Sequence, residues 1–475
     1  MSREEQIINE RKRKIKELRE SGINPYGYVF DKKNNISECK KIGAKVKTAG
    51  RLMTKRDLGK IAFAHLQDES GRIQLVLQEG ETQQKDFFKK FIDAGDFVGI
   101  EGKIIKTKTG EISILVKKIE ILSKSILPLP EKFHGLKGEE EKLRKRYLDM
   151  TMNSDVRDVF VKRAKILEIL REFMNKKEFV EVETPLLQTI YGGASAKPFK
   201  THCDAYNSDL YLSIAPELFL KKALVGGFEK VYEITKKFRN EGADRQHNPE
   251  HMTIEWYQAY ADYNDGMDLF EEMMKMIAKK LFGKLEIVYQ GHKINLGKWE
   301  RIGILDAIKK YLKEDVSNVK TDAEARKIAE KHGIEKGITK INLPDELMKL
   351  FRDKIIQPTF LIDYPIELAP LAKPKRGDPT KAEIFQPIVG GMELARAYSE
   401  LNDPSLQLEH FEEQESERKK GNEEAMETDK DFVTALEHGM PPACGVGIGI
   451  ERLVMLFTDS ASIRDVIMFP FVKAN

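Results

Sequence analysis

The hydrophobic pattern of this chain changes between residues 123 and 150, and the change predicts at least two domains of different architecture. Residues 44–122 hold five short β-rich runs, with Gly-containing turns such as DESGR and KTKTGE between runs. One helical segment, TQQKDFFKKFI, lies between the third and fourth runs. Five strands with an inserted helix are typical of a small Greek-key barrel of the oligonucleotide-binding (OB) type, which commonly binds single-stranded nucleic acid. We therefore expect an OB-type barrel over 44–122.

The segments on either side of this barrel differ from it. Residues 1–43 are predicted to be an N-terminal helical extension, because 3–20 carry a thin apolar stripe on an otherwise charged helix. Such a helix is either solvated and partly frayed or a basic arm that contacts nucleic-acid phosphates. Residues 123–150 are predicted to be a linker, because the prolines of SILPLPEK favour an extended backbone.

Residues 151–475 show an α+β pattern. The segment DVFVKRAKILEILREFMNKKEF predicts a long amphipathic helix, and VEVETPLLQ predicts a strand that ends at Pro185. Further strands then mix with helices, and the chain closes with a strand–turn–helix, ACGVGIGIERLVMLFTD. This order predicts a domain built on an antiparallel β-sheet flanked by helices.

Composition excludes several classes of protein. The 475 residues exceed one ordinary domain, and a formal net charge of only +3 means that nucleic-acid binding must depend on local patches. Cys39, Cys203 and Cys444 lie far apart, which argues against disulfides or structural zinc and fits a reducing compartment. The charged N-terminus is unlike a secretory signal, and no apolar run is long enough to span a membrane. We expect a cytoplasmic protein.

Two glycine-rich segments carry residues suited to anionic or cationic ligands. In GVGIGIERLVMLF, alternating glycines permit close backbone approach, and Arg452 at the start of the next helix can reach a polyphosphate. The alternative is a glycine-rich strand that simply enters a buried helix. In IVGGMELARAYSELNDP, Glu393 and Glu400 suit Mg²⁺ or a cationic ligand. The alternative there is surface salt bridging.

A third segment, KKFRNEGADRQHNPEHMTIEWYQAYADY, places polar side chains on two strands and the loop between them. Arg239 and Glu241 alternate on the first strand, and Glu255 and Tyr257 share one face of the second. The loop adds Arg245, His247 and His251. A solvated hairpin face is the simpler interpretation, but Trp256 and Tyr257 favour a covered sheet and therefore a site.

Taken in this order, the three segments resemble the class II aminoacyl-tRNA synthetases, and more narrowly the lysyl-tRNA synthetase family. FVEVETPLLQ is similar to motif 1, FRNEG to motif 2 and GIGIERL to motif 3. The lysine branch is indicated by RLMTKRDLGK, GGASAKPF, APELFLKK, HNPE, AYADY, AYSELNDP, GMPPACGVGIGIERL and SIRDVIMFP. The resemblance extends over roughly 44–472.

The resemblance implies an activity and its partners. It implies ATP-dependent activation of L-lysine to lysyl-adenylate and transfer to the 3′ end of tRNA(Lys) in translation, with Mg²⁺ as cofactor. It also implies a cytoplasmic homodimer that forms through motif 1, without membrane attachment. In this family the barrel binds the anticodon and the sheet domain carries the chemistry.

Matching positions imply roles for individual residues. For ATP, Arg239 would hold the α-phosphate, Glu241 the adenine amino group and Arg452 the γ-phosphate, while the loop residues His247, Asn248 and His251 would close over the nucleotide. Glu393 would bind Mg²⁺, with Gln386 at the position of a second metal ligand. The implied lysine-binding residues are Gly193, Glu217, Glu255, Tyr257, Arg396 and Glu400. The implied anticodon-binding residues are Phe63, Gln74 and Glu111, with Phe63 as a stacking platform.

Three positions depart from the family pattern. His251 stands where a phenylalanine usually stacks on adenine, and an imidazole can titrate. Gln386 replaces a glutamate and brings no charge to the metal site. Arg396 replaces an asparagine, and its guanidinium would repel lysine unless it turns outward or pairs with another acid.

Three other interpretations stay open. Arg396 motivates a synthetase of this family with shifted amino-acid specificity. A synthetase-like RNA-binding or regulatory protein without ligase activity is disfavoured by the retained Arg239, Glu241 and Arg452. A transferase that modifies a protein is disfavoured by the predicted barrel, which that task would not require.

Overall fold

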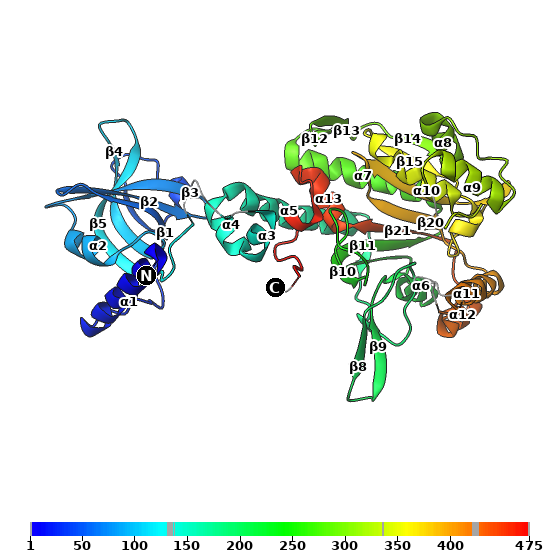
Figure 1. The fold of residues 1–475 in the computed structure, drawn as a ribbon, viewed down its shortest axis with the longest axis horizontal. Coiled ribbons are helices and arrows are strands. Elements are labelled where there is room, and N and C mark those ends of the chain that lie inside the picture. Colours follow the sequence, from blue (N-terminus) through cyan, green and yellow to red (C-terminus); the bar gives the residue numbers. More distant parts are fainter. Residues whose placement is uncertain (1, 131–135, 137, 335–336, 420–426, 474–475) are drawn as a thin grey trace. The chain divides into compact units, whose positions relative to one another are not determined.

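The computed structural model describes residues 2–130, 136, 138–334, 337–419 and 427–473, which fall into two compact units, 1–137 and 138–475. The first unit is a closed barrel in the strand order β1-β2-β3-β5-β4 (Figure 1). Its elements are α1 (Arg3–Glu20), η1 (Ile36–Glu38), β1 (Lys45–Asp57), β2 (Ile61–Asp68), β3 (Gly71–Gln78), α2 (Lys85–Phe91), β4 (Phe97–Lys106) and β5 (Ile112–Ser123). The predicted barrel with one inserted helix is confirmed.

The barrel closes around side chains that alternate in and out along each strand. Leu52, Leu66, Leu75, Val98 and Ile114 point inward and are fully buried. Antiparallel pairing joins β1 to both β2 and β4, and parallel pairing of β3 with β5 completes the ring. This alternation is the feature of the sequence from which the strands were predicted.

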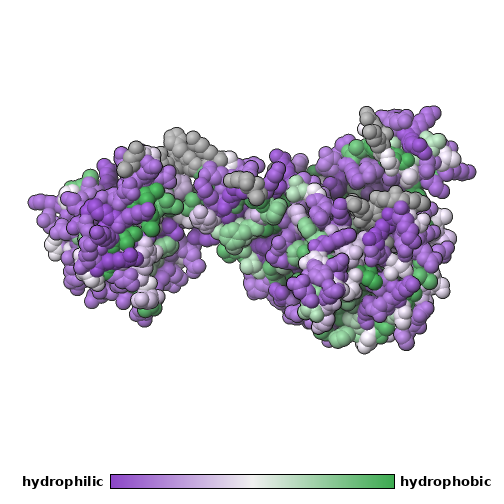
Figure 2. Space-filling model, turned by 60° about the horizontal axis from the view of Figure 1, so that its bottom comes forward, coloured by the Kyte–Doolittle hydropathy of each residue, from purple (hydrophilic) through white to green (hydrophobic). Residues whose placement is uncertain are grey.

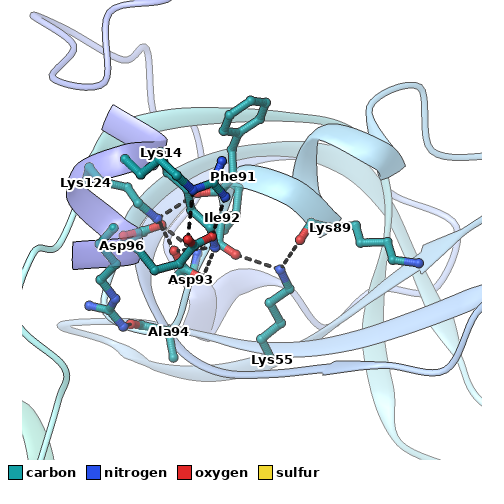
Figure 3. A network of polar contacts seen from close by, with 12 residues as sticks. Lys14, Lys55, Lys89, Phe91, Ile92, Asp93, Ala94, Asp96 and Lys124 are labelled. Carbon is teal, nitrogen blue, oxygen red and sulfur yellow. Dashed lines mark hydrogen bonds and ion pairs between the residues drawn. The ribbon is translucent and has the colours of Figure 1, made fainter. Parts of the chain in front are cut away.

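Helix α1 belongs to the first unit and is anchored by buried polar groups. Arg11 donates to the carbonyl oxygens of Ala94 at 2.7 Å and Leu127 at 2.8 Å. Figure 3 shows Lys14 and Lys124 beside Asp93 and Asp96. We call the five residues Arg11, Lys14, Asp93, Asp96 and Lys124 the barrel network. One side of α1 is therefore packed against the barrel. Neither expected alternative, a solvated and frayed helix or a basic arm on nucleic-acid phosphates, included this packing.

The second unit begins with helices α3 (Glu139–Arg144), α4 (Arg146–Met152) and α5 (Ser154–Lys176), so the part of 123–150 from residue 138 onward is largely helical. Its main sheet has the order β14-β15-β18-β20-β21-β11-β10-β6, with β19 paired to β18. The central strands pair antiparallel, whereas β6 and β14 join the two edges in parallel. The sheet is thus mixed, with an antiparallel centre as predicted.

The strands of this unit are β6 (Val180–Glu181), β7 (Leu187–Gln188), β8 (Lys200–Cys203), β9 (Ser208–Leu212), β10 (Lys230–Phe238), β11 (Glu250–Ala259), β12 (Glu286–Tyr289), β13 (His292–Asn295), β14 (Glu300–Gly303), β15 (Thr359–Ile362), β16 (Pro374–Lys375), β17 (Asp378–Ala382), β18 (Ile384–Val389), β19 (Met392–Glu393), β20 (Ala395–Ser399) and β21 (Ala443–Gly449). The remaining helical elements are α6 (Glu217–Val225), α7 (Tyr263–Phe282), α8 (Ile304–Leu312), α9 (Asp322–Lys331), α10 (Leu343–Lys349), η2 (Arg352–Lys354), η3 (Ile366–Leu368), α11 (Pro404–Lys419), α12 (Lys430–Glu437), α13 (Ile450–Thr458) and η4 (Ile463–Asp465).

Helices α5, α7 and α13 bury one face of the main sheet. Leu170, Phe270 and Leu453 from these helices pack with Ile254 and Trp256 of β11 in one core. Because strand side chains alternate, the neighbouring residues of β11, at 255 and 257, point to the opposite face. That face is the one available for a site.

The predicted strand VEVETPLLQ is wrong for most of its length. Only the two-residue strands β6 and β7 form within it. Thr184 explains the interruption, because its backbone N–H and hydroxyl both donate to the Glu233 carboxylate, at 3.1 and 2.7 Å, in place of a strand partner. Pro185 follows and has no N–H to donate.

Hydrophilic residues dominate the face of the molecule in Figure 2, with hydrophobic residues in smaller areas. Among the described residues, no helix combines the length and apolar character needed to cross a membrane.

Candidate functional site

A cleft of about 330 Å³ lies on the open face of the main sheet in the second unit. β11, β20 and β21 supply its floor, and the loop between β10 and β11 supplies one wall. Predicted site residues that line it are Gly193, Glu217, Arg239, Glu241, His247, Asn248, His251, Glu255, Tyr257, Glu393, Arg396 and Arg452. Segments far apart in the sequence therefore meet in one cleft.

Two glycines of β21 make room for the floor of this cleft. A Cβ atom on Gly445 would lie 2.1 Å from Oε1 of Glu400 and 2.3 Å from the Tyr257 ring. A Cβ atom on Gly447 would lie 3.3 Å from Cγ of Glu255. The alternating glycines thus let acidic and aromatic side chains lie directly across the backbone of β21.

Glu217 and Glu255 line one end of the cleft, and Glu400 lies fully buried behind that end, outside the described residues that line it; we call these three residues the acid pocket. Lys221 is completely buried beside two of them, with its Nζ 2.6 Å from Glu217 Oε1 and 2.5 Å from Glu400 Oε2. Lys221 was not predicted from the sequence. The sequence could have indicated Lys221 by its position four residues after Glu217, on the same face of helix α6.

The electrostatics of the acid pocket favour an incoming cation. Burial raises the pKa of Glu255 to about 8. Burial also opposes the charge of Lys221, but its ion pairs with Glu217 and Glu400 keep the pKa of its ammonium group raised. Lys237 lies nearby with its pKa lowered by burial. The pocket therefore holds one carboxyl group, that of Glu255, which ionises readily only when another positive charge arrives.

Two arginines, Arg239 and Arg452, lie at the opposite end of the cleft. Arg452, in the first turn of α13, donates to the Glu393 carbonyl at 2.8 Å and lies 3.1 Å from Nε2 of His247. Arg239 directly follows β10, lines the cleft and has a buried Nε that no described residue accepts from. Glu241 accepts from the backbone N–H of Lys197 at 3.3 Å. Unused guanidinium donors of this kind suit phosphate oxygens.

His251 lies in this end of the cleft as a neutral ring. Burial, together with the charge of Arg239, lowers the pKa of His251 to about 3. The ring therefore stays uncharged at neutral pH, as an adenine-stacking aromatic residue would. His251 is the second residue of β11 and not part of the loop, where it was predicted to lie; Asn248 lies in the loop, and its Nδ2 donates to the Glu250 carbonyl at 2.5 Å.

The two implied metal ligands lie in different surroundings. Glu393 lines the cleft, and its side chain is 22% exposed. Gln386 is buried in β18, is not among the described residues that line the cleft, and accepts a hydrogen bond from the Tyr364 hydroxyl through Oε1. In the described part of the chain, no three His, Cys, Asp or Glu side chains gather as a metal site. Glu393 fits a metal held mainly by phosphate oxygens and water, whereas Gln386 does not.

Arg396 lines the middle of the cleft from β20 and interacts with groups outside the acid pocket. Its NH2 group donates to the Leu368 carbonyl at 3.1 Å, and its buried Nε has no acceptor among the described residues. Despite burial, Tyr398, Glu393 and Asp345 raise the pKa of Arg396. Within the described residues it forms no ion pair with the acid pocket. Arg396 was expected to turn outward or to pair with another acid; it stays buried, and its hydrogen-bond partner among the described residues is a backbone carbonyl, not an acid.

The first unit gathers the implied anticodon residues on one outer surface of the barrel. Gln74 on β3 donates to Glu111 at 2.8 Å and accepts from the Ser113 hydroxyl at 2.9 Å. Phe63 lies on β2, two residues before His65, which pairs with Gln74 across the sheet. His65 was not predicted from the sequence, although the two-residue spacing from Phe63 places it on the same face.

Comparisons with known proteins cover both units. A family model described as class II tRNA synthetases (D, K and N) matches residues 138–473, and a model of the OB-fold nucleic acid binding domain matches 46–122. The chain is 48% identical to a lysine–tRNA ligase of Fervidobacterium nodosum, over 97% of this chain and 93% of that protein. It is also 48% identical to one from Clostridium acetobutylicum (98% and 93% covered) and 47% identical to one from Thermosipho africanus (99% and 95% covered).

Proposed function

The chain belongs to the class II tRNA synthetases, within the lysine–tRNA ligase family, and from that premise we propose that it activates L-lysine with ATP and transfers it to tRNA(Lys). One observation carries the proposal: a cleft with an acid pocket at one end and the arginines Arg239 and Arg452 at the other. A lysine side chain ends in a compact ammonium group, which matches the first end. The triphosphate of ATP matches the second.

The reaction then requires positioning more than a protein nucleophile. The substrate ammonium group enters the acid pocket, where Glu255 ionises to receive it. Arg239 orients the lysine carboxylate and the α-phosphate, so that a carboxylate oxygen attacks the α-phosphorus as the bond to pyrophosphate breaks. Arg452 holds the far phosphate. Glu393 would hold Mg²⁺, which when bound neutralises charge on phosphate oxygens.

Transfer of the lysyl group to tRNA then takes place in the same cleft. A ribose hydroxyl of the terminal tRNA adenosine attacks the carbonyl carbon of the lysyl-adenylate, and AMP leaves. The barrel surface around Phe63, Gln74 and Glu111 would bind the anticodon, with a base stacked on Phe63. This assigns recognition of the tRNA to the first unit and the chemistry to the second.

We also propose a homodimer in the cytoplasm. The segment matching motif 1 and the helix before it leave apolar side chains exposed: Val161 (62%), Val180 (46%), Leu186 (39%) and Leu187 (53%). Exposed apolar side chains close together in sequence favour a surface that another chain covers. Sedimentation of the purified chain tests this proposal, and a monomer at micromolar concentration contradicts it.

Pyrophosphate exchange tests the activity directly. The full chain is incubated with ATP, labelled pyrophosphate and each of the twenty amino acids in turn, and label entering ATP is counted. We expect lysine alone to drive exchange. Exchange driven only by a different amino acid supports shifted specificity and overturns the lysine assignment. Binding of tRNA without exchange by any amino acid supports the non-catalytic alternative.

A further inference from the structure

The surroundings of Glu393 hold positive side chains where the family pattern has a second metal ligand. Gln386 occupies that ligand position, but it is buried and its Oε1 is engaged by the Tyr364 hydroxyl. For the Gln386 side chain to reach the cleft, this hydrogen bond would have to break, and β18 is buried along its whole length. The carbonyl oxygen of Gln386 is therefore not available to a metal ion bound in the cleft.

Arginines surround the remaining carboxylate. Arg352 of η2 places NH1 4.0 Å from Oε2 of Glu393. Arg452 binds the Glu393 backbone carbonyl, and the charge of Arg396 couples to the Glu393 carboxylate. A second divalent cation beside Glu393 would therefore face three guanidinium groups.

Two of these arginines keep donors free for an anion: Arg396 lines the cleft, and Arg352 lies behind Gln246 and Glu393, which line it. Arg352 is tied to the loop between β10 and β11, because its NH2 group donates to Gln246 Oε1 at 3.2 Å, and its side chain is still 24% exposed. Arg396 has a buried Nε without an acceptor among the described residues. A guanidinium group with unused donors beside a cleft suits the oxygens of a polyphosphate.

We propose that Arg352 and Arg396 supply the charge that a second Mg²⁺ would otherwise bring, so that this chain binds ATP with a single divalent cation. The inference rests on the proposed function, because it assigns ATP to this cleft. Asp345 and Glu393 balance the two guanidinium groups when the cleft is empty, and the phosphates take over as partners when ATP enters. Arg352 was not identified from the sequence, because it lies outside the three motif segments.

Metal counting tests this inference without turnover. Electron paramagnetic resonance measures free Mn²⁺ in a titration of the full chain saturated with an ATP analogue that has a methylene group between its α- and β-phosphates. We expect one bound Mn²⁺ per site in the wild-type chain. Two bound ions would overturn the inference while leaving lysine activation standing, since pyrophosphate exchange measures that separately. A chain that binds no analogue would overturn both.

Arg352→Gln provides a second measurement, because this half-buried side chain can change without emptying the core. The loss of a charge-assisted hydrogen bond to phosphate should weaken analogue binding by roughly tenfold to a hundredfold. The matched control is Arg326→Gln, on the exposed face of α9, which should leave binding unchanged. Unchanged analogue affinity in Arg352→Gln would overturn the assigned role of Arg352.

The double variant Gln386→Glu with Arg396→Asn sharpens the metal count. It restores the family residues at both positions, and a gain of a second bound Mn²⁺ would support the replacement of metal by guanidinium. A folded double variant that still binds one ion would contradict the part of the inference that rests on Arg396.

Discussion

Each unit of this chain buries one lysine between two carboxylates. In the barrel, Lys124 Nζ lies 2.5 Å from Asp93 and 2.7 Å from Asp96. In the catalytic unit, Lys221 Nζ lies 2.6 Å from Glu217 and 2.5 Å from Glu400. Both lysine side chains are completely buried. The two clusters thus hold an ammonium group and two carboxylates at closely similar separations.

The two clusters differ in the further hydrogen bonds that their carboxylates accept. Asp96 also accepts from the backbone N–H groups of Ser125 at 2.8 Å and Asp93 at 2.7 Å, and Asp93 accepts from Lys14 at 2.8 Å. Apart from its ion pair with Lys221, Glu400 accepts no hydrogen bond through its side chain from the described residues. Saturated clusters stabilise a fold, whereas an acid cluster with unused acceptors is suited to a ligand.

The largest expected effect comes from Glu255→Gln in the acid pocket. This carboxylate forms no ion pair within the described residues, so its charge is the one left for the substrate. We expect kcat/KM for lysine in pyrophosphate exchange to fall roughly 100- to 1000-fold, because an amide leaves a buried ammonium group short of a counter-ion. Glu286→Gln, at an exposed position of β12 in the same unit, should leave kcat/KM unchanged. Equal loss in both variants would mean that the acid pocket is not the lysine site.

The matching change in the barrel is Asp96→Asn, which should lower the stability of the fold and leave activity unchanged. Removing one of two carboxylates around Lys124 should lower the free energy of unfolding by about 2–3 kcal/mol, while pyrophosphate exchange stays normal. Urea unfolding of the full chain measures the loss. Glu101→Gln removes an exposed ion pair of the same barrel and should cost under about 1 kcal/mol. Similar losses from both changes would erase the distinction between the two clusters.

The smallest effect is a pH dependence confined to the acid pocket. Because burial raises the pKa of Glu255 to about 8, this carboxyl group is protonated in the empty pocket at pH values well below 8, and lysine binding must release its proton. The KM for lysine should therefore fall as pH rises, by up to about tenfold per pH unit until the pKa of Glu255 is passed. Kinetics on both sides of neutral pH measure the slope, and Glu255→Gln should reduce it. A flat profile in the wild-type chain contradicts the raised pKa of Glu255.

The same raised pKa affects stability with a defined sign. In the native state Glu255 holds its proton above the pH at which an unfolded glutamate releases it. The ligand-free catalytic unit should therefore lose stability as pH rises from the ordinary glutamate range toward the raised pKa of about 8. Saturating lysine should offset this loss.

Local patterns in the sequence predicted much of this molecule, and long-range pairings set the rest. The barrel strands follow from alternation and glycine turns within 44–122, and the two cleft arginines, Arg239 and Arg452, follow from motif segments. The anchoring of α1 could not be predicted, because Arg11 finds its acceptors 83 and 116 residues away. The ion pair of Lys221 with Glu400 joins separate elements in the same way. A continuous strand was wrongly predicted across Thr184, because a carboxylate partner on another strand leaves no local signal.

The bare backbone at Gly445 has a consequence for resistance to inhibitors. Every replacement at this position adds a Cβ atom, which would collide with Glu400 and Tyr257 of the protein itself. A compound that packs against this stretch of main chain would therefore meet a position where any substitution also forces Glu400 and Tyr257 to move, so that escape by mutation here would disturb the site itself.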